Sequence, residues 1–209
     1  MRIADSLRSV SAAAMRSHSA SLESTDMTTL TQSIGRSHRV TAIGVVGFAA
    51  AVAAASQIAI PLPWTPVPLT LQPMLVILAG MLLGPVAGAV SMALYLAAGA
   101  AGLPVFTPIG APGVARFFGP TGGYLIAYPA AAYVAGFLTQ RSLSFAGRWL
   151  AGVAGIAVIY LGGIAQLFLL SGGIVRAVQL GVIPFAAVDV VKAFIAAAIT
   201  APRMARRDS

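Results

Sequence analysis

The feature that most constrains the fold is a long stretch without charge. No Asp, Glu, Lys or Arg occurs between Val40 and Ala115. Only 9% of the chain is charged, against about a quarter in soluble domains, and 58% is hydrophobic. Because a bilayer is spanned by apolar helices of about 20 residues, we predict an all-α integral membrane protein.

Glycine and proline divide the apolar sequence into six segments, and each is predicted to be a transmembrane helix. The segments are residues 41–60, 69–83, 86–101, 121–139, 149–170 and 184–201. The second and third are short for a crossing, so tilting or local thinning of the bilayer is expected. Residues 40–202 would form the membrane domain and 203–209 a basic cytoplasmic tail. Residues 1–39 are interpreted as a disordered cytoplasmic tail, with Met27 as an alternative start of the protein.

The distribution of cations predicts the orientation. With the N-terminus inside, ten of the thirteen Lys and Arg residues lie on cytoplasmic segments. Arg116 and Arg176 lie on outer loops, and Lys192 lies within the last span. This is the positive-inside pattern of a multi-pass plasma-membrane protein with both termini in the cytoplasm. The net charge of +8 is attributed to this pattern, and no nucleic-acid partner is expected.

Two opposite charges inside the last segment indicate where function resides. Asp189 and Lys192 are three residues apart, so they share one face of a helix. A charge at bilayer depth costs about 2.5–3.5 kcal/mol on insertion scales and usually faces a partner or a ligand. The pair either neutralises itself or forms a polar clamp for a ligand. Three loops, 61–73, 102–120 and 171–183, fall on the outer side, which predicts an outward-facing pocket floored by this pair.

Several chemistries lack the residues that they need. The chain has no Cys, and its two His residues both lie before Val40, so no metal site is expected. It has no P-loop, GxSxG or HExxH motif and no paired carboxylates in its membrane region, so an enzyme is not expected. The first segment carries the small-residue pairs Ala49 and Ala53, and Ala50 and Ala54. These pairs favour close helix contact, or they reflect only the alanine content.

Five segments, in this order, resemble the BioY family of biotin-binding substrate (S) components of energy-coupling factor (ECF) transporters. They are Pro66–Gln72 (PVPLTLQ), Leu78–Pro85 (LAGMLLGP), Ala100–Phe106 (AAGLPVF), Phe118–Leu125 (FGPTGGYL) and Asp189–Lys192 (DVVK). The resemblance extends from about residue 40 to 201. It implies a six-helix S-component fold, with biotin bound near the outer surface as the transported ligand and no cofactor. It also implies a transmembrane coupling subunit and ATPase subunits as partners.

The resemblance also assigns roles to individual residues. Asp189 would accept hydrogen bonds from the ureido N–H groups of biotin, and Lys192 would donate to the ligand or hold Asp189 charged. Arg116 is the candidate for the biotin carboxylate. Weaker candidates for the pocket are Tyr160, Gln166 and Trp64, while the docking surface for the coupling subunit would be Ala49, Ala50, Ala53 and Ala54. The loop before Arg116 departs from the family pattern, so no other contact is transferred there.

Three alternatives remain open. The chain could be an S component for another small vitamin, which the DVVK and GPTGGYL segments oppose. It could be a self-contained secondary carrier that needs no ATPase. It could also be a structural or signalling subunit without a ligand pocket, in which case Asp189 and Lys192 could be jointly replaced by Leu without loss of function.

Overall fold

The computed structural model describes residues 39–142 and 144–204, with side chains up to residue 201. Its contacts divide the chain into two units, residues 1–42 and 43–209. Within the first unit, residues 39–42 are described, and they are helical. The predicted tail 1–39, apart from its last residue, and most of the basic tail 203–209 lie outside the described residues. The architecture below is that of the second unit.

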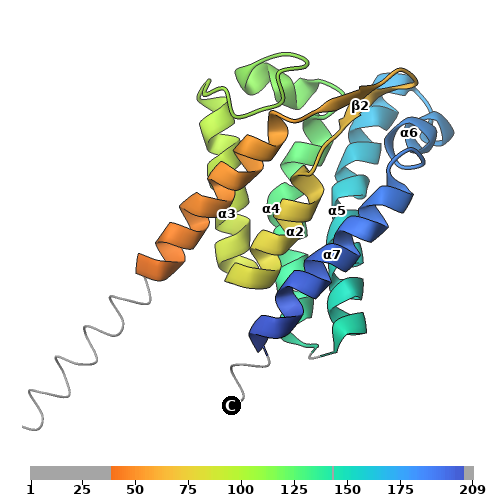
Figure 1. Ribbon diagram of the computed structural model, residues 1–209. Coiled ribbons are helices and arrows are strands. Elements are labelled where there is room, and N and C mark those ends of the chain that lie inside the picture. The colour runs from red at the N-terminus through yellow and green to blue at the C-terminus, as the bar shows by residue number, and fades with distance from the viewer. Residues whose placement is uncertain (1–38, 143, 205–209) are drawn as a thin grey trace, which may run out of the picture. The chain divides into compact units, whose positions relative to one another are not determined.

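The predicted segments form helices whose ends differ from the predictions by a few residues (Figure 1). A first helix, Arg39–Ser56, is followed by six others. They are α2 (Gln72–Leu83), α3 (Pro85–Ala100), α4 (Gly122–Gln140), α5 (Phe145–Ser171), α6 (Ile174–Gly181) and α7 (Ala186–Met204). Gly84 separates α2 from α3 with a φ of 89°, a conformation that favours glycine, and Pro85 opens α3.

Two of the predicted loops contain regular structure that the sequence did not predict. The proline-rich segment forms an antiparallel hairpin of β1 (Ile60–Leu62) and β2 (Thr65–Leu69), in which Leu62 pairs with Thr65. Both strands are edge strands, which is the setting in which a sheet tolerates proline. The connector 171–183 contains the short helix α6. The second unit is therefore mostly helical, as the predicted all-α class requires, with one small two-stranded sheet in addition.

In the part of the chain that the structure describes, helix length and composition support fewer spans than six. The first helix and α5 are long and apolar enough to cross a bilayer, and α6 with α7 would count as a third if this pair, bent by 54°, is one span. The helices α2 and α3 are apolar but shorter, and α2, with 12 residues, is only about 18 Å long. The lengths and composition of these helices are thus typical of a membrane protein.

Small residues allow the central helices to pack closely. Helix α4 lies against α5 where Gly123 meets Gly162: a Cβ added to Gly123 would lie 2.1 Å from the Gly162 carbonyl oxygen. Helix α2 meets α4 in the same way, because a Cβ on Gly80 would lie 1.9 Å from the Ala132 carbonyl oxygen. Glycine at these positions lets the backbones come together as they do in membrane bundles.

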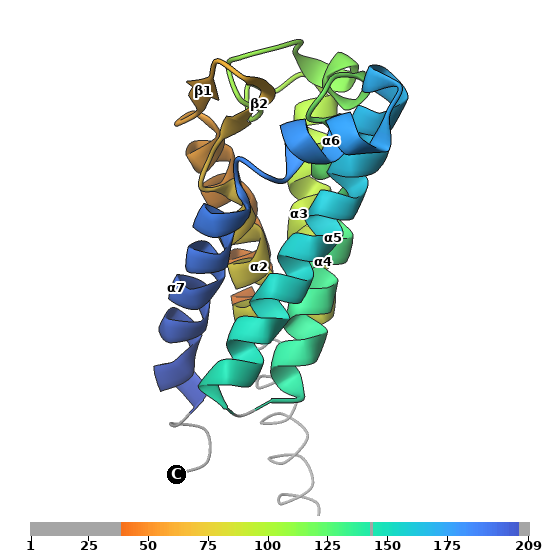
Figure 2. The same ribbon diagram turned by 90° about the vertical axis from the view of Figure 1, so that its right-hand side faces the viewer.

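The irregular segments of the second unit gather at one end. The hairpin, α6 and the 3-10 helix η1 (Gly113–Phe118) lie at the end opposite the α4–α5 link and the end of α7 (Figures 1 and 2). The Thr65 hydroxyl donates to the Leu180 carbonyl across 2.6 Å, tying β2 to α6. The Ser56 hydroxyl donates to the Val105 carbonyl across 2.6 Å, tying the long loop to the first helix. The three loops therefore share one end, as predicted.

Candidate ligand-binding pocket

A pocket lies beneath this covering of loops. It contains about 620 Å³ of empty space, including the part that opens to solvent. Its walls come from the end of β2, from helices α2, α3, α4, α5 and α7, and from the 102–120 loop. Four of the predicted binding residues line it: Arg116, Tyr160, Asp189 and Lys192. These four residues come from three elements, η1, α5 and α7, and the structure brings them together at one pocket.

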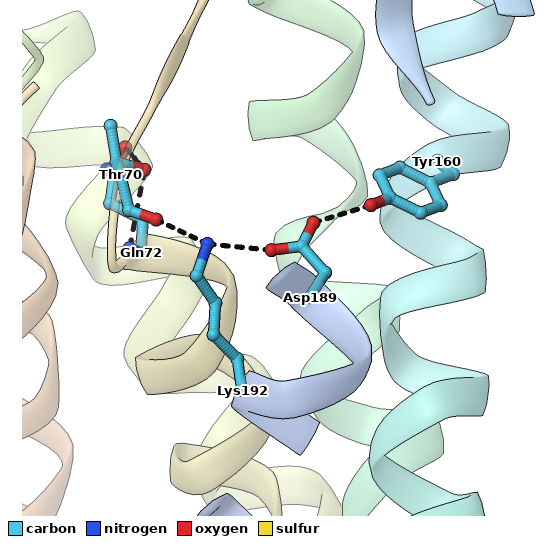
Figure 3. Close-up of polar contacts among 5 residues, drawn as sticks. All are labelled: Thr70, Gln72, Tyr160, Asp189 and Lys192. Carbon is cyan, nitrogen blue, oxygen red and sulfur yellow. Dashed lines mark hydrogen bonds and ion pairs between the residues drawn. The ribbon is translucent and has the colours of Figure 1, made fainter. Parts of the chain in front are cut away.

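The floor of the pocket is a buried ion pair. Asp189, in the first turn of α7, is 3% exposed, and its Oδ1 lies 2.7 Å from Nζ of Lys192. The Tyr160 hydroxyl donates to Oδ2 across 2.6 Å, from α5 (Figure 3). In the described part of the chain no other ion pair occurs. The carboxylate is therefore held at both oxygens, and its place near a helix N-terminus adds a favourable dipole interaction.

Hydrogen bonds continue from the ion pair across the pocket. Lys192 Nζ also donates to the carbonyl oxygen of Thr70, at 2.7 Å (Figure 3). The Thr70 hydroxyl makes a long contact of 3.4 Å with Gln72 Oε1, and Gln72 Nε2 donates to the Tyr95 hydroxyl across 2.8 Å. A polar chain from α5 to α3 thus joins Tyr160, Asp189, Lys192, Thr70, Gln72 and Tyr95.

Arg116 is a buried cation that forms no ion pair with any residue that the structure describes. It lies on η1, is 5% exposed, and donates to the carbonyl oxygens of Thr107 and Ile109. Its Nε is buried and has no hydrogen-bond partner among the described residues. Burial lowers the pKa of Arg116 below its ordinary value, an effect that Tyr95 opposes. Because a buried charge needs compensation, the pocket wall at Arg116 suits an anionic group.

Arg116 and the Asp189–Lys192 pair lie on different elements of the pocket wall, and aromatic side chains line the same pocket. Helix η1 contacts α3 and α4, whereas α7 contacts α2 and α5. The Tyr95 ring packs edge-on against Phe106, with centroids 5.5 Å apart, and stacks with Tyr128 at 6.4 Å. The pocket therefore suits a ligand with a hydrogen-bonding group, an apolar body and an anionic group.

Two predicted binding residues do not line the pocket. Trp64 lies in the hairpin turn and is 64% exposed. Gln166 is half-buried on α5, where its side chain packs beside Gly123. Conversely, sequence reasoning assigned no ligand role to Gln72 or Tyr124, and both line the pocket. Their place in the PVPLTLQ and GPTGGYL segments was the available signal.

The small-residue surface of the first helix is divided between two faces. Ala49 is buried, whereas Ala53 is half-buried and packs against the core of the second unit. Ala50 and Ala54 are exposed. Of the four alanines predicted to dock a coupling subunit, Ala50 and Ala54 are thus the fully exposed ones.

Comparison with known proteins places this chain in a family. The sequence profile of the BioY family matches residues 26–208. The chain belongs to the BioY family. The resemblance of the five segments is thereby confirmed, and the matched region extends further toward the N-terminus than those segments do.

Individual relatives agree with this assignment. A probable biotin transporter BioY of Pyrococcus horikoshii is 45% identical over 61% of this chain and 75% of its own length. The biotin transporter BioY of Thermotoga maritima is 39% identical over 73% of this chain and 88% of its own. The fold is similar to the crystal structure of the S-component for biotin from an ECF-type ABC transporter, with a TM-score of 0.74. That match is 28% identical and covers 81% of this chain and 93% of the other.

Proposed function

We propose that this chain takes up biotin as the substrate-binding component of an ECF transporter. The relatives named as biotin transporters and the S-component with a similar fold support this proposal. The observation that carries it is the pairing of two groups in one apolar pocket: a hydrogen-bonded carboxylate at Asp189 and an uncompensated cation at Arg116. Biotin has the complementary groups at its two ends.

The chemistry of biotin matches this pocket group by group. Its ureido ring has two N–H donors, which Asp189 would accept as charge-assisted hydrogen bonds. Its valerate carboxylate would neutralise Arg116, and its apolar body would pack against Tyr95, Phe106 and Tyr128. Tyr160 and Lys192 would hold the Asp189 carboxylate in its orientation, because each binds one of its two oxygens.

For the topology we propose six crossings within residues 40–202, with both termini in the cytoplasm of a plasma membrane. The arginine distribution supports this arrangement, since ten cations lie on the proposed inner segments and two on the outer loops. Helices α2 and α3 would cross with local thinning, which their close packing against α4 helps to accommodate. The pocket would then open to the outside.

The energy for biotin uptake would come from other proteins. The chain carries no P-loop, so a coupling subunit and ATPase subunits are the proposed partners. The coupling subunit would dock on the exposed alanines of the first helix, Ala50 and Ala54. The chain itself is proposed to bind and release biotin without chemical change and without a cofactor.

Uptake of radiolabelled biotin by a transport-deficient cell tests this proposal. We expect uptake when the chain is expressed with a coupling subunit and ATPases, and loss of uptake when the ATPases carry an inactivated P-loop. Uptake that persists without any ATPase would indicate a secondary carrier. Uptake of thiamine in place of biotin would indicate a component for another vitamin.

A further inference from the structure

Lys192 contacts two different parts of the molecule. Its Nζ lies 2.7 Å from Oδ1 of Asp189 and also 2.7 Å from the carbonyl oxygen of Thr70 (Figure 3). Thr70 directly follows β2 and precedes α2. One ammonium group therefore joins the floor of the pocket to the end of the hairpin that covers it. Two of its three N–H donors are used in these contacts.

Few hydrogen bonds hold the hairpin in place. Within the described ranges, residues 60–70 make one other hydrogen bond to a distant segment besides that from Lys192 to Thr70: the Thr65 hydroxyl donates to Leu180 on α6. No hydrogen bond joins the hairpin to residues 102–120 among the residues that the structure describes. Apolar contacts of Leu62, Val67 and Leu69 with the core complete its attachment. The bond from Lys192 is the only one of the two that involves a charged donor.

The long loop on the other side of the pocket is attached independently. Its residues Pro104, Val105 and Phe106 accept hydrogen bonds from Ser56, the last residue of the first helix, and from Gln57, which follows it. Arg116 holds the same loop by donating to two of its carbonyl groups. Loss of Lys192 is therefore expected to release the hairpin without releasing this loop.

We propose that Lys192 is a positioning residue that holds the hairpin closed over Asp189, rather than primarily a donor to the ligand. The functional consequence of this inference rests on the proposed function. If the chain binds biotin, release of the hairpin would speed the dissociation of biotin. The bond from Lys192 to Thr70, which we call the clamp, is present in the protein without biotin. Because hydrogen bonds to charged groups are stronger than neutral ones, its loss is expected to be measurable as local opening.

Amide hydrogen exchange of the biotin-free protein in detergent tests the clamp. The comparison is between Asp189→Asn and the double variant Asp189→Asn/Lys192→Met, because neither leaves a buried carboxylate unpaired. We expect the amides of residues 62–71 to exchange about tenfold faster in the double variant. The amides of residues 113–119 should be unchanged. Equal exchange of residues 62–71 in the two variants would overturn the proposal.

Two further variants test whether faster exchange of the hairpin has a cause other than the loss of Lys192. Thr70→Val removes the hydroxyl contacts with Gln72 but keeps the carbonyl that Lys192 binds, so hairpin exchange should stay within about twofold of wild type. Rapid exchange throughout the first double variant would indicate that the whole protein is destabilised. In that case Asp189→Leu/Lys192→Met is used instead, because replacement of a buried ion pair by apolar residues is often tolerated. It should again accelerate the hairpin alone, and slow exchange there would contradict the clamp. Failure of biotin binding would overturn the proposed function but leave this result unaffected.

Discussion

The Tyr160 hydroxyl donates a hydrogen bond of 2.6 Å to Oδ2 of Asp189, while Lys192 donates to Oδ1. The carboxylate is thus fixed by one residue from α5 and one from α7. Each carboxylate oxygen can accept about two hydrogen bonds, so both retain capacity for a ligand. Pre-orientation of this kind reduces the entropy that is lost when a ligand binds.

Removing the Tyr160 hydroxyl should weaken biotin binding. Tyr160→Phe takes away one charge-assisted hydrogen bond, and we expect the dissociation constant for biotin to rise about tenfold or more by isothermal titration calorimetry. Tyr133→Phe is the matched control, since Tyr133 is an exposed tyrosine on α4. Equal affinities for the wild type and Tyr160→Phe would show that this bond does not support the site.

Arg116 should discriminate an acid from its neutral amide. Arg116→Gln removes the uncompensated cation, so biotin should bind about ten- to hundredfold more weakly, while biotin amide, which carries no negative charge, should be much less affected. Arg176→Gln is the control, because Arg176 is exposed on α6. Equal losses for the acid and the amide would exclude Arg116 as the carboxylate partner.

The contact between α2 and α4 should not tolerate a methyl group. In Gly80→Ala the new Cβ would lie 1.9 Å from the Ala132 carbonyl oxygen, so the helices must separate, at a cost of about 1–3 kcal/mol. Gly47→Ala is the matched control, since a Cβ there meets nothing within 4 Å. Thermal unfolding in detergent should show a lower midpoint for Gly80→Ala and an unchanged or higher one for Gly47→Ala. The same midpoint for both variants would contradict the close packing.

Docking of the chain on a coupling subunit should be separable from biotin binding. The double change Ala50→Leu/Ala54→Leu enlarges the exposed small-residue surface of the first helix, so uptake should fall about tenfold or more while biotin affinity stays unchanged. Ala130→Leu, at an exposed alanine on α4, controls for added bulk at the surface. Normal uptake by the double variant would place the docking surface elsewhere.

Much of the fold was predictable because its signals are local. Apolar runs end at glycine and proline, and Gly84–Pro85 does separate two helices as predicted. Asp189 and Lys192 were identifiable because charged residues in an apolar helix are energetically unfavourable and usually have a functional role. Arg116 was the single charge in a loop otherwise free of charged residues. These signals depend on residue type alone.

The remaining features depend on tertiary contacts. Lys192 binds the backbone carbonyl of Thr70, a group that every residue possesses and that no motif marks. Ala49 and Ala50 are adjacent and identical, yet one is buried and the other exposed, because the packing of the helix decides which face is inside. Trp64 has the residue type of a pocket wall, but its place in the hairpin turn directs it elsewhere.

Equilibrium binding of labelled biotin to the purified chain in detergent tests the central claim most directly. We predict saturable binding at one site per chain, displaced by desthiobiotin, which keeps the ureido group and the carboxylate, and not by thiamine. Asp189→Asn should reduce the affinity about hundredfold, because it removes the charged acceptor of the ureido N–H groups. Absence of saturable binding, or equal affinity for the wild type and Asp189→Asn, would contradict the account.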